Sequence, residues 1–471
     1  MNIATRFIFL FTSLVVPLLW PTVCAGQYYG GSSNSKSFSL QRWEEDYSYL
    51  KDRSARSDIF DPIKFIPLNS AGDFYISFGG QARYRYDYFN NRSFGPGQND
   101  EDGWHLQRYL VHADAHFGEH LRAFVQLSSS FNDGREGGSR YGDEQHLDFQ
   151  QAFVDIKTSE DANPFAYVRL GRQELTYGAE RFVGPDDWRN VRRSFDGAKL
   201  AVSIRRDTFE VFLVRPVIIE QTQWDNDEPG TVFAGFYNVT ALPDVINVDA
   251  NSRLDVYFFA LNQDADSTAR VDTDTYTVGA RFHSKPKPFD FDIEGNYQFG
   301  EVASESISAW SFAAEAGYTF AGLTLSPRAS VGFDIASGSS DPEGRFNQLY
   351  PPTYTYLGHL YLFGRTNLID AHVGLDFHLT DSLTLFTAHH TFWRQNDNDA
   401  LYYLNSAVVR ADTGSDAAYV GNEFDIALTW QINRHISAYM GYAHFFTGDF
   451  IAETGASKDA DFLYASVTFT F

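Results

Sequence analysis

The sequence lacks several features that common classes of protein require. It has 471 residues and one cysteine, Cys24, so it can form no internal disulfide and offers no thiol pair for redox chemistry. Basic residues are scarce, with 37 Lys and Arg against 61 Asp and Glu and a formal charge of −24. A chain so acidic, with no basic face evident, is not expected to bind nucleic acid. Net charge does not exclude an anionic ligand, because it does not say which side chains line a particular site.

Long apolar runs are also scarce. The one clear run, residues 7–20, follows Arg6 and precedes small residues at 23–25. This pattern is typical of a secretory signal, so we expect a signal peptide over 1–25 with cleavage after its last residue. An uncleaved anchor and lipidation of Cys24 are the alternatives; the shortness of the run and its prolines disfavour the first. Since no second such run follows, the pattern indicates an exported chain that is not a helical membrane protein.

Aromatic residues make up 17% of the chain, and many lie in segments that alternate with period two. In the final segment, 462–471, one face is apolar and the other mostly polar, which is the pattern of a lipid-facing barrel strand. The terminal aromatic, Phe471, resembles the signal read by the barrel assembly machinery of the outer membrane, which is therefore an expected partner. The alternative is the edge strand of a soluble sandwich.

The same alternation predicts an all-β fold, a transmembrane antiparallel β-barrel of about 18 strands in the cell outer membrane. We expect residues 26–72 to form an N-terminal periplasmic segment and 73–471 to form the barrel. The expected strands are 73–89, 104–118, 120–131, 146–158, 165–174, 196–206, 207–217, 231–241, 252–263, 272–284, 289–301, 306–320, 323–337, 366–378, 383–395, 417–431, 435–447 and 460–471.

The gaps between these strands support the barrel independently. Gaps after odd-numbered strands are mostly long, such as 175–195 and 338–365, whereas those after even-numbered strands are mostly short, such as 118–120 and 206–207. Long extracellular loops that alternate with short periplasmic turns are typical of outer-membrane barrels. Such a barrel is wide enough to enclose a polar lumen, which a loop or the N-terminal segment can plug.

Several short motifs resemble the alginate export family, an outer-membrane family of alginate secretion porins. They run from residue 42 to 394 and comprise residues 42–50, 62–68, 79–86, 170–175, 190–197, 364–370 and 389–394. The resemblance implies a monomeric barrel of about 18 strands. It also implies secretion of an anionic exopolysaccharide, an alginate-like polymer made at the inner membrane, selected by arginines in the lumen.

Arginine suits this task because its planar guanidinium binds a carboxylate through two hydrogen bonds and stays charged. Many weak sites of this kind would let a polymer move without being trapped. On the first strand Arg83 and Arg85 share the face expected to line the lumen, and replacing both by Glu should weaken anion selectivity without unfolding the barrel. The candidates for the substrate path are Arg83, Arg85, Arg108, Arg169, Arg172, Arg192, Arg193, Arg365, Arg394 and Arg410.

The alternative for each arginine is a structural ion pair with an acid in the lumen, such as Asp87, Asp114, Asp155 or Glu174. Acidic residues on other inward faces, such as Asp290, Asp292 and Glu294, favour a second function, a general or substrate-specific nutrient porin.

No motif marks a nucleophile, so no catalytic residues, enzyme activity or cofactors are expected. No metal site is expected either, because the neighbours His389 and His390 point to opposite faces of a strand and cannot easily chelate one ion. The remaining partners expected are outer-membrane lipid, lipopolysaccharide and periplasmic export proteins.

Overall fold

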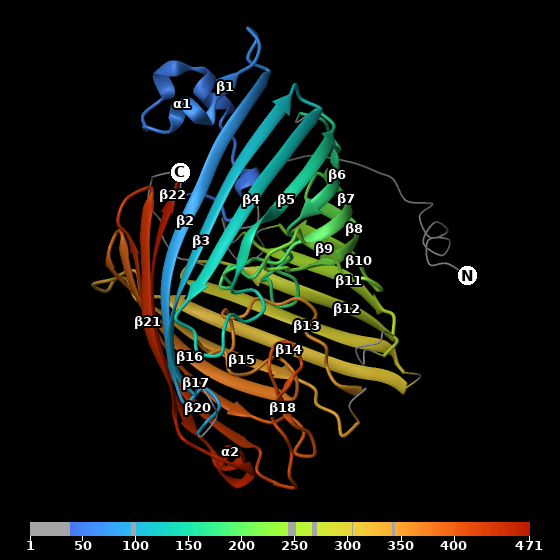
Figure 1. Cartoon of the computed structure of the whole chain (residues 1–471), viewed down its shortest axis with the longest axis vertical. Helices are drawn as coiled ribbons and strands as arrows, with labels where there is room; N and C mark the ends of the chain where they lie inside the picture. Colours follow the sequence, from blue (N-terminus) through green and yellow to red (C-terminus); the bar gives the residue numbers. More distant parts are fainter. Residues whose placement is uncertain are drawn as a thin grey trace.

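A computed structural model describes residues 38–95, 100–159, 161–243, 251–265, 271–303, 305–341 and 344–471. The expected signal peptide lies outside these residues. Within them, the main sheet has 20 strands, of which β1 and β9 are two-residue pieces, and the other 18 form the barrel wall. Consecutive wall strands pair antiparallel, and β2 pairs with β22 to close the ring (Figure 1).

The wall strands are β2 (Phe74–Asn90), β3 (Glu101–Phe117), β4 (Leu121–Asp133), β5 (Gln145–Lys157), β6 (Phe165–Gln173), β7 (Phe195–Ile204), β8 (Asp207–Ile218), β10 (Thr231–Ala241), β11 (Arg253–Gln263), β12 (Thr273–Ser284), β13 (Phe289–Val302), β14 (Glu305–Thr319), β15 (Arg328–Ala336), β16 (Leu368–Thr380), β17 (Leu383–Trp393), β20 (Tyr419–Gln431), β21 (Ile436–Thr447) and β22 (Ala460–Thr470). The strands expected from the alternation are therefore confirmed, most of them within three residues.

Period-two alternation sorts each strand onto two faces. On β13, Ile293 and Tyr297 are exposed on the outer face of the wall. Their sequence neighbours Asp292, Glu294 and Gln298 are buried on the inner face. A bilayer favours this arrangement, because apolar side chains meet lipid and polar side chains avoid it. Because the ring has no free edge, the backbone N–H and C=O groups of every strand can form hydrogen bonds with a neighbouring strand.

One expected strand, 323–337, is wrong at its start. The strand β15 begins at Arg328 because Leu325 and Ser326 have positive φ angles of 68° and 40° and are followed by Pro327. Positive φ interrupts the extended backbone, and proline has no N–H for a ladder. Residues 323–326 instead form a turn in which Ser326 N donates to the Leu323 carbonyl at 3.1 Å.

The connections differ between the two ends of the barrel, as the gaps predict. We call one end the short-turn end, where Gly118 and Arg205 make tight turns with φ angles of 68° and 58°. The other is the long-loop end, which carries the short strands β9 (Asn226–Asp227), β18 (Leu401–Tyr402) and β19 (Val408–Arg410) and the helix α2 (Asp449–Thr454).

Residues before the barrel wall form short elements at the short-turn end (Figure 1). These are the 3-10 helices η2 (Arg42–Glu44), η3 (Ser48–Lys51) and η4 (Arg53–Ala55), the helix α1 (Asp61–Lys64) and the strand β1 (Ile66–Pro67), which pairs with β2. In the described parts of the chain, no helix has the length and apolar character that a membrane crossing demands.

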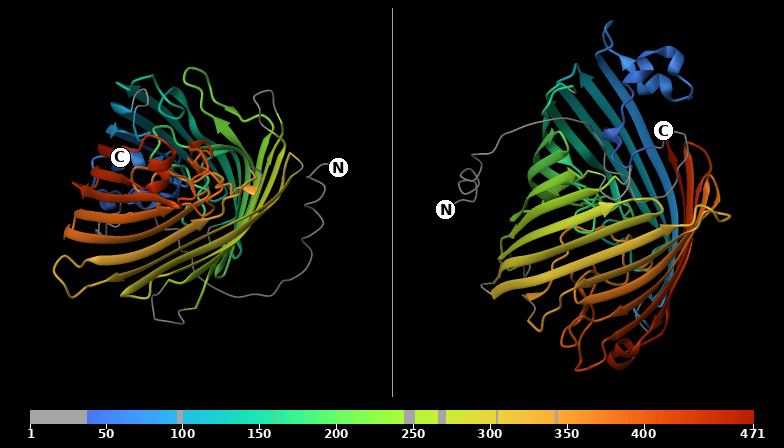
Figure 2. Two further views of the ribbon diagram at one scale, coloured as in Figure 1. Left: turned by 90° about the horizontal axis from the view of Figure 1, so that it is seen from below. Right: turned by 180° about the vertical axis from the view of Figure 1, so that it is seen from behind.

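The apolar core lies inside the ring, where loops fold in from the long-loop end (Figure 2). Residues 174–194 form what we call the first inner segment and residues 344–367 the second. Phe182 and Phe346, one from each segment, share a buried cluster with the wall residues Phe233 and Phe259. A second cluster packs residues 360–363 against further wall aromatics. The inner segments are thus fixed by the burial of aromatic and aliphatic side chains.

A charge on the outward face of the barrel should destabilise the protein in a membrane. Val373, near the middle of β16 and 53% exposed, should meet lipid, so Val373→Arg should lower the free energy of unfolding by about 2–4 kcal/mol. Urea titration of the protein in liposomes measures this change. The control is Ser382→Arg in the exposed turn after β16, for which we expect little loss. An equal loss in both variants would refute the assignment of the lipid-facing surface.

Candidate functional site

The first inner segment crosses the lumen and is held by arginines of the nearby wall. Arg83 donates from Nη1 to the Asp187 carbonyl oxygen at 2.6 Å and from Nη2 to the Arg189 carbonyl oxygen at 2.8 Å. Arg108, which lies directly opposite Arg83 across β2 and β3, donates to the same Asp187 carbonyl at 3.0 Å. Irregular backbone needs donors for its carbonyl groups, and here charged side chains of the wall supply them.

The two inner segments are joined at Trp188. Its ring stacks on Tyr354 of the second segment with the ring centroids 3.8 Å apart, and the Arg85 guanidinium lies over its other side, 4.0 Å from the ring centroid. Arg85 also donates to the Trp188 carbonyl. Beside this stack, the Asp186 carboxylate accepts a 2.5 Å hydrogen bond from the Thr353 hydroxyl. The segments therefore form one connected structure inside the barrel.

The Asp187 carboxylate lies among three guanidinium groups. Its Oδ1 is 2.7 Å from Arg108 Nη2 and 3.3 Å from Arg192 Nη1, and its Oδ2 is 3.9 Å from Arg83 Nη1. The interior position opposes ionisation, but the attraction of Arg108, Arg83 and Arg192 outweighs it and lowers the pKa of Asp187 to about 2. Its side chain is still 40% exposed to the lumen. Such an arrangement is a binding site for a carboxylate, occupied here by one from the protein.

Every arginine proposed from the sequence has a partner within the protein. Beside those already described, some form ion pairs: Arg169 with Asp155 at 2.7 Å, Arg172 with Asp196 at 2.9 Å, Arg192 with Glu174 at 2.8 Å and Arg365 with Asp334 at 2.6 Å. Others donate mainly to backbone carbonyls: Arg193 to Gly184 and Pro351, Arg394 to Asp399 and Ser415, and Arg410 to Ala456. The structural use of these side chains is thus evident, and their contact with a ligand stays a prediction.

Charged side chains inside the barrel form two groups. Around the tip of the first inner segment lie the guanidinium groups of Arg83, Arg85, Arg108, Arg189, Arg192 and Arg193 and the carboxylates of Asp87, Glu174, Glu180, Asp186 and Asp187. The second group lies on β11 to β16, where Asp255, Asp290, Asp292, Glu294, Glu315, Asp334, Asp370 and Asp376 surround Arg181, Arg281, Arg328, Arg365 and His372. We call the first group the arginine-rich side and the second group the acid-rich side of the lumen.

Residues 41–43 enter the lumen from the short-turn end. Gln41 Nε2 donates to Glu174 Oε2 at 3.0 Å, at the base of the first inner segment. The Trp43 ring lies 3.8 Å from the Arg169 guanidinium, measured from its centroid, and Arg42 donates to the carbonyls of Gly80 and Phe471 on either side of the closing strand pair. The N-terminal segment therefore contributes to the contents of the lumen, together with both inner segments.

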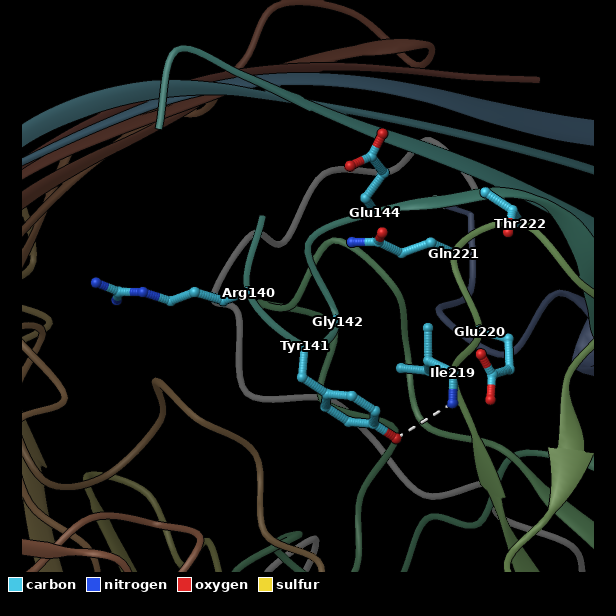
Figure 3. A pocket seen from close by; sticks show the side chains of 8 residues that line it. All are labelled: Arg140, Tyr141, Gly142, Glu144, Ile219, Glu220, Gln221 and Thr222. Carbon is cyan, nitrogen blue, oxygen red and sulfur yellow. Dashed lines mark hydrogen bonds between the residues drawn. The ribbon is translucent and has the colours of Figure 1, made fainter. Parts of the chain in front are cut away.

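A cavity of about 330 Å³ opens at the long-loop end between the β4–β5 loop and the segment that follows β8. Figure 3 shows its lining, in which the Tyr141 hydroxyl accepts a 3.2 Å hydrogen bond from Ile219 N, while Arg140 points away from this pair. Gln221 and Thr222 add polar groups to one wall, and Glu144 adds a carboxylate. Hydroxyl, amide and guanidinium groups of this kind suit hydrogen bonding to a sugar.

The sequence allowed for a loop or the N-terminal segment inside the lumen but did not identify which loops fold inward. A signal was available: surface loops are usually polar, yet residues 360–363 read Leu-Tyr-Leu-Phe and are buried. Another is the cluster Asp186-Asp187 beside Arg189, Arg192 and Arg193, because a loop that carries both charges so densely can pair with itself and with the wall.

The architecture defines an outer-membrane β-barrel channel. The sequence matches the alginate export family over residues 74–464. The chain belongs to this family of outer-membrane barrels, which agrees with the expectation that it is not an enzyme.

Solved structures share the fold at low sequence identity. Acinetobacter baumannii OccAB1 is 12% identical with a TM-score of 0.60, over 87% of this chain and 99% of that one. Pseudomonas aeruginosa OpdO is 12% identical with a TM-score of 0.56, over 84% and 97%. Pseudomonas aeruginosa OpdK, solved with vanillate, is 10% identical with a TM-score of 0.56, over 84% and 98%. Among curated proteins, no sequence matches this chain.

The first inner segment generates a pH prediction. Burial and the nearby carboxylates Asp187, Asp186 and Glu174 raise the pKa of Glu180 to about 7. As pH rises through 7, this group should gain a negative charge beside the arginine-rich side, so anion selectivity should fall between about pH 6 and 8. Reversal potentials in planar bilayers measure this change. In Glu180→Gln the change should be much smaller, whereas the control Glu119→Gln, in an exposed turn at the short-turn end, should keep it.

If Glu180→Gln retained the full pH dependence of the wild type, another group would be responsible and the assignment to Glu180 would be wrong.

Proposed function

We propose that this channel secretes an anionic, alginate-like exopolysaccharide, and that the polymer passes along the arginine-rich side of the lumen. The observation that carries this proposal is the Asp187 carboxylate, held by Arg83, Arg108 and Arg192 and yet 40% exposed. A uronate polymer presents one carboxylate on each sugar. The site that holds Asp187 is chemically able to hold such a carboxylate instead.

Transport needs sites that bind and release without a large rearrangement. Asp187 meets this need, because it keeps the guanidinium groups charged and ordered when no polymer is present, while its own side chain is 40% exposed to the lumen. When a uronate carboxylate arrives, it exchanges with Asp187 for hydrogen bonds of the same kind, so little energy is gained or lost at each step. Arg193, whose partners are carbonyl oxygens and the Tyr350 ring, adds positive field to the same region.

The inner segments suit a gate in this proposal. Trp188 and Tyr354 stack across the middle of the path, and a polymer needs this stack to move or separate. The cavity beside Tyr141 and Arg140 at the long-loop end offers polar groups where a polymer would leave the barrel. The export direction rests on membership of the family, and the acidic polysaccharide is the partner that it implies.

A second candidate is uptake of a small solute. It is favoured by the acid-rich side of the lumen, where carboxylates such as Asp290 and Asp376 surround Arg328 and leave a negative excess. A channel that uses this side would prefer cations and would not be blocked by an oligouronate.

The first test is the ion selectivity of the purified channel. Under a salt gradient in a planar bilayer, we expect a reversal potential that indicates anion selectivity, and block by an added oligouronate. Arg83→Glu together with Arg85→Glu should reduce the selectivity and weaken the block by at least about tenfold, since two guanidinium groups are replaced by carboxylates. The control is Arg215→Glu, whose side chain is 53% exposed and pairs with Asp227.

Cation selectivity without block in the wild type would instead support the small-solute channel. Retention of the folded barrel by the double variant is checked by its heat-dependent mobility in gel electrophoresis.

Asp187→Asn gives a prediction of the opposite sign. If Asp187 competes with the polymer for the same guanidinium groups, removing its charge should strengthen block by the oligouronate several-fold and increase anion selectivity. A concentration series of the oligouronate in bilayer recordings measures the change. Weaker block in this variant, in the same direction as the arginine substitutions, would show that Asp187 only maintains the structure and would contradict the exchange mechanism.

A further inference from the structure

A compact group of histidines and carboxylates lies on the inner wall, away from the arginine-rich side. It consists of Asp370 and His372 on β16, His390 on β17, and Glu423 and Asp425 on β20. Asp370, Glu423 and Asp425 are each 0% exposed, and His390 is 6% exposed. The proposed function uses none of them.

The sheet register brings these residues together. Asp370 and His372 are two apart on one strand and therefore share a face. His372 is paired across the ladder with His390, and His390 is paired with Glu423 on the next strand. Asp425 follows two residues after Glu423 on the same face. His389, the sequence neighbour of His390, is exposed on the outer face. The second histidine of the group is therefore His372, from the adjacent strand.

Both imidazole rings point a nitrogen at the same carboxylate oxygen. His372 Nδ1 lies 2.8 Å and His390 Nδ1 lies 3.0 Å from Asp370 Oδ2. Ligand atoms from these residues all lie within 4.8 Å of one another. Around a tetrahedral ion with bonds of about 2.0–2.2 Å, neighbouring ligand atoms stand about 3.4 Å apart, so small side-chain shifts would admit one ion.

The carboxylates behind this group lack ordinary counter-ions. Among the described residues, the structure pairs none of Asp370, Glu423 and Asp425 with a lysine or arginine, and the nearest cationic group to Asp425 is His390 Nε2 at 3.7 Å. Glu423 Oε2 and Asp425 Oδ1 are buried and receive no hydrogen bond from another donor group in the described parts of the chain, so these two carboxyl groups have only each other with which to share a proton. Burial of uncompensated carboxylate charge is costly, so this group needs either a shared proton or a bound cation.

The second inner segment closes this group off from the lumen. Leu360 N donates to Glu423 Oε1 at 2.8 Å and His359 N donates to Asp425 Oδ2 at 3.3 Å. Gly358 permits this close approach, because it has a φ of +78° and a Cβ there would lie 2.4 Å from Glu423 Oε1. A cation bound here would therefore be enclosed, and would tie the second inner segment to the wall.

We propose that Asp370, His372 and His390 bind one divalent transition-metal ion of the zinc class, with a carboxylate from Glu423 or Asp425 completing the site. Calcium and magnesium prefer sites made wholly of oxygen, whereas two imidazoles with carboxylates suit zinc and its neighbours in the first transition row. The ion takes the place of the protons between the imidazoles and Asp370. The second inner segment covers the site and the His372 side chain is only 12% exposed, so the ion would have a structural role.

Zinc titration of the full chain, prepared without a histidine tag, refolded in detergent and freed of metal with a chelator, tests the proposal. Calorimetry should give one zinc ion per barrel, and cobalt in its place should give the visible absorption bands of nitrogen and oxygen ligands. His372→Ala and His390→Ala should each weaken binding by at least about 100-fold, more than is typical of an outer-shell partner. The matched control is His389→Ala, on the same strand but facing outward, which should bind as the wild type does.

Heat-dependent gel mobility identifies variants that have lost the barrel. If the folded wild type binds no zinc, the buried carboxylates are neutralised by protons and the proposal is wrong. It is equally wrong if folded His372→Ala and His390→Ala bind as tightly as His389→Ala. Neither result bears on the passage of polysaccharide, which is tested separately at the arginines of β2.

Discussion

The hydrogen bonds from wall arginines to backbone carbonyls of the first inner segment support the rest of this structure. A barrel of this width must contain water or protein, and irregular backbone inside it needs donors that the closed ladder of the wall no longer offers. Arg83 and Arg108 provide them at Asp187 and Arg189. Guanidinium groups suit this purpose because each carries five donors in one plane and stays charged.

The same arrangement explains how structural and functional uses of arginine can coincide. A guanidinium that binds a carbonyl with one edge still attracts anions with its charge, and Asp187 demonstrates that a carboxylate fits among Arg108, Arg192 and Arg83. The acid-rich side balances its own arginines within ion-pair networks such as that of Arg328. The two groups of charges therefore hold the inner segments in place, and the proposed function depends on the arginine-rich group.

The wall could be predicted from the sequence because it depends on local alternation. The expected strand 231–241 agrees with β10. The expected strand 323–337 begins too early, because positive φ at Leu325 and Ser326 leaves no mark on the pattern of apolar residues. The contents of the lumen could not be predicted. The contact of Trp188 with Tyr354 joins residues far apart in the chain, and the pairing of His372 with His390 depends on register, which a single strand does not reveal.

Arg42 has a consequence for assembly of the barrel. It donates to the carbonyl of Gly80 on β2 and to that of Phe471 beside β22, so it needs both sides of the closing seam in place. Both hydrogen bonds of Arg42 can therefore form together only when the first and last wall strands have met. The N-terminal segment thus stabilises the closed ring relative to one that is open at this seam.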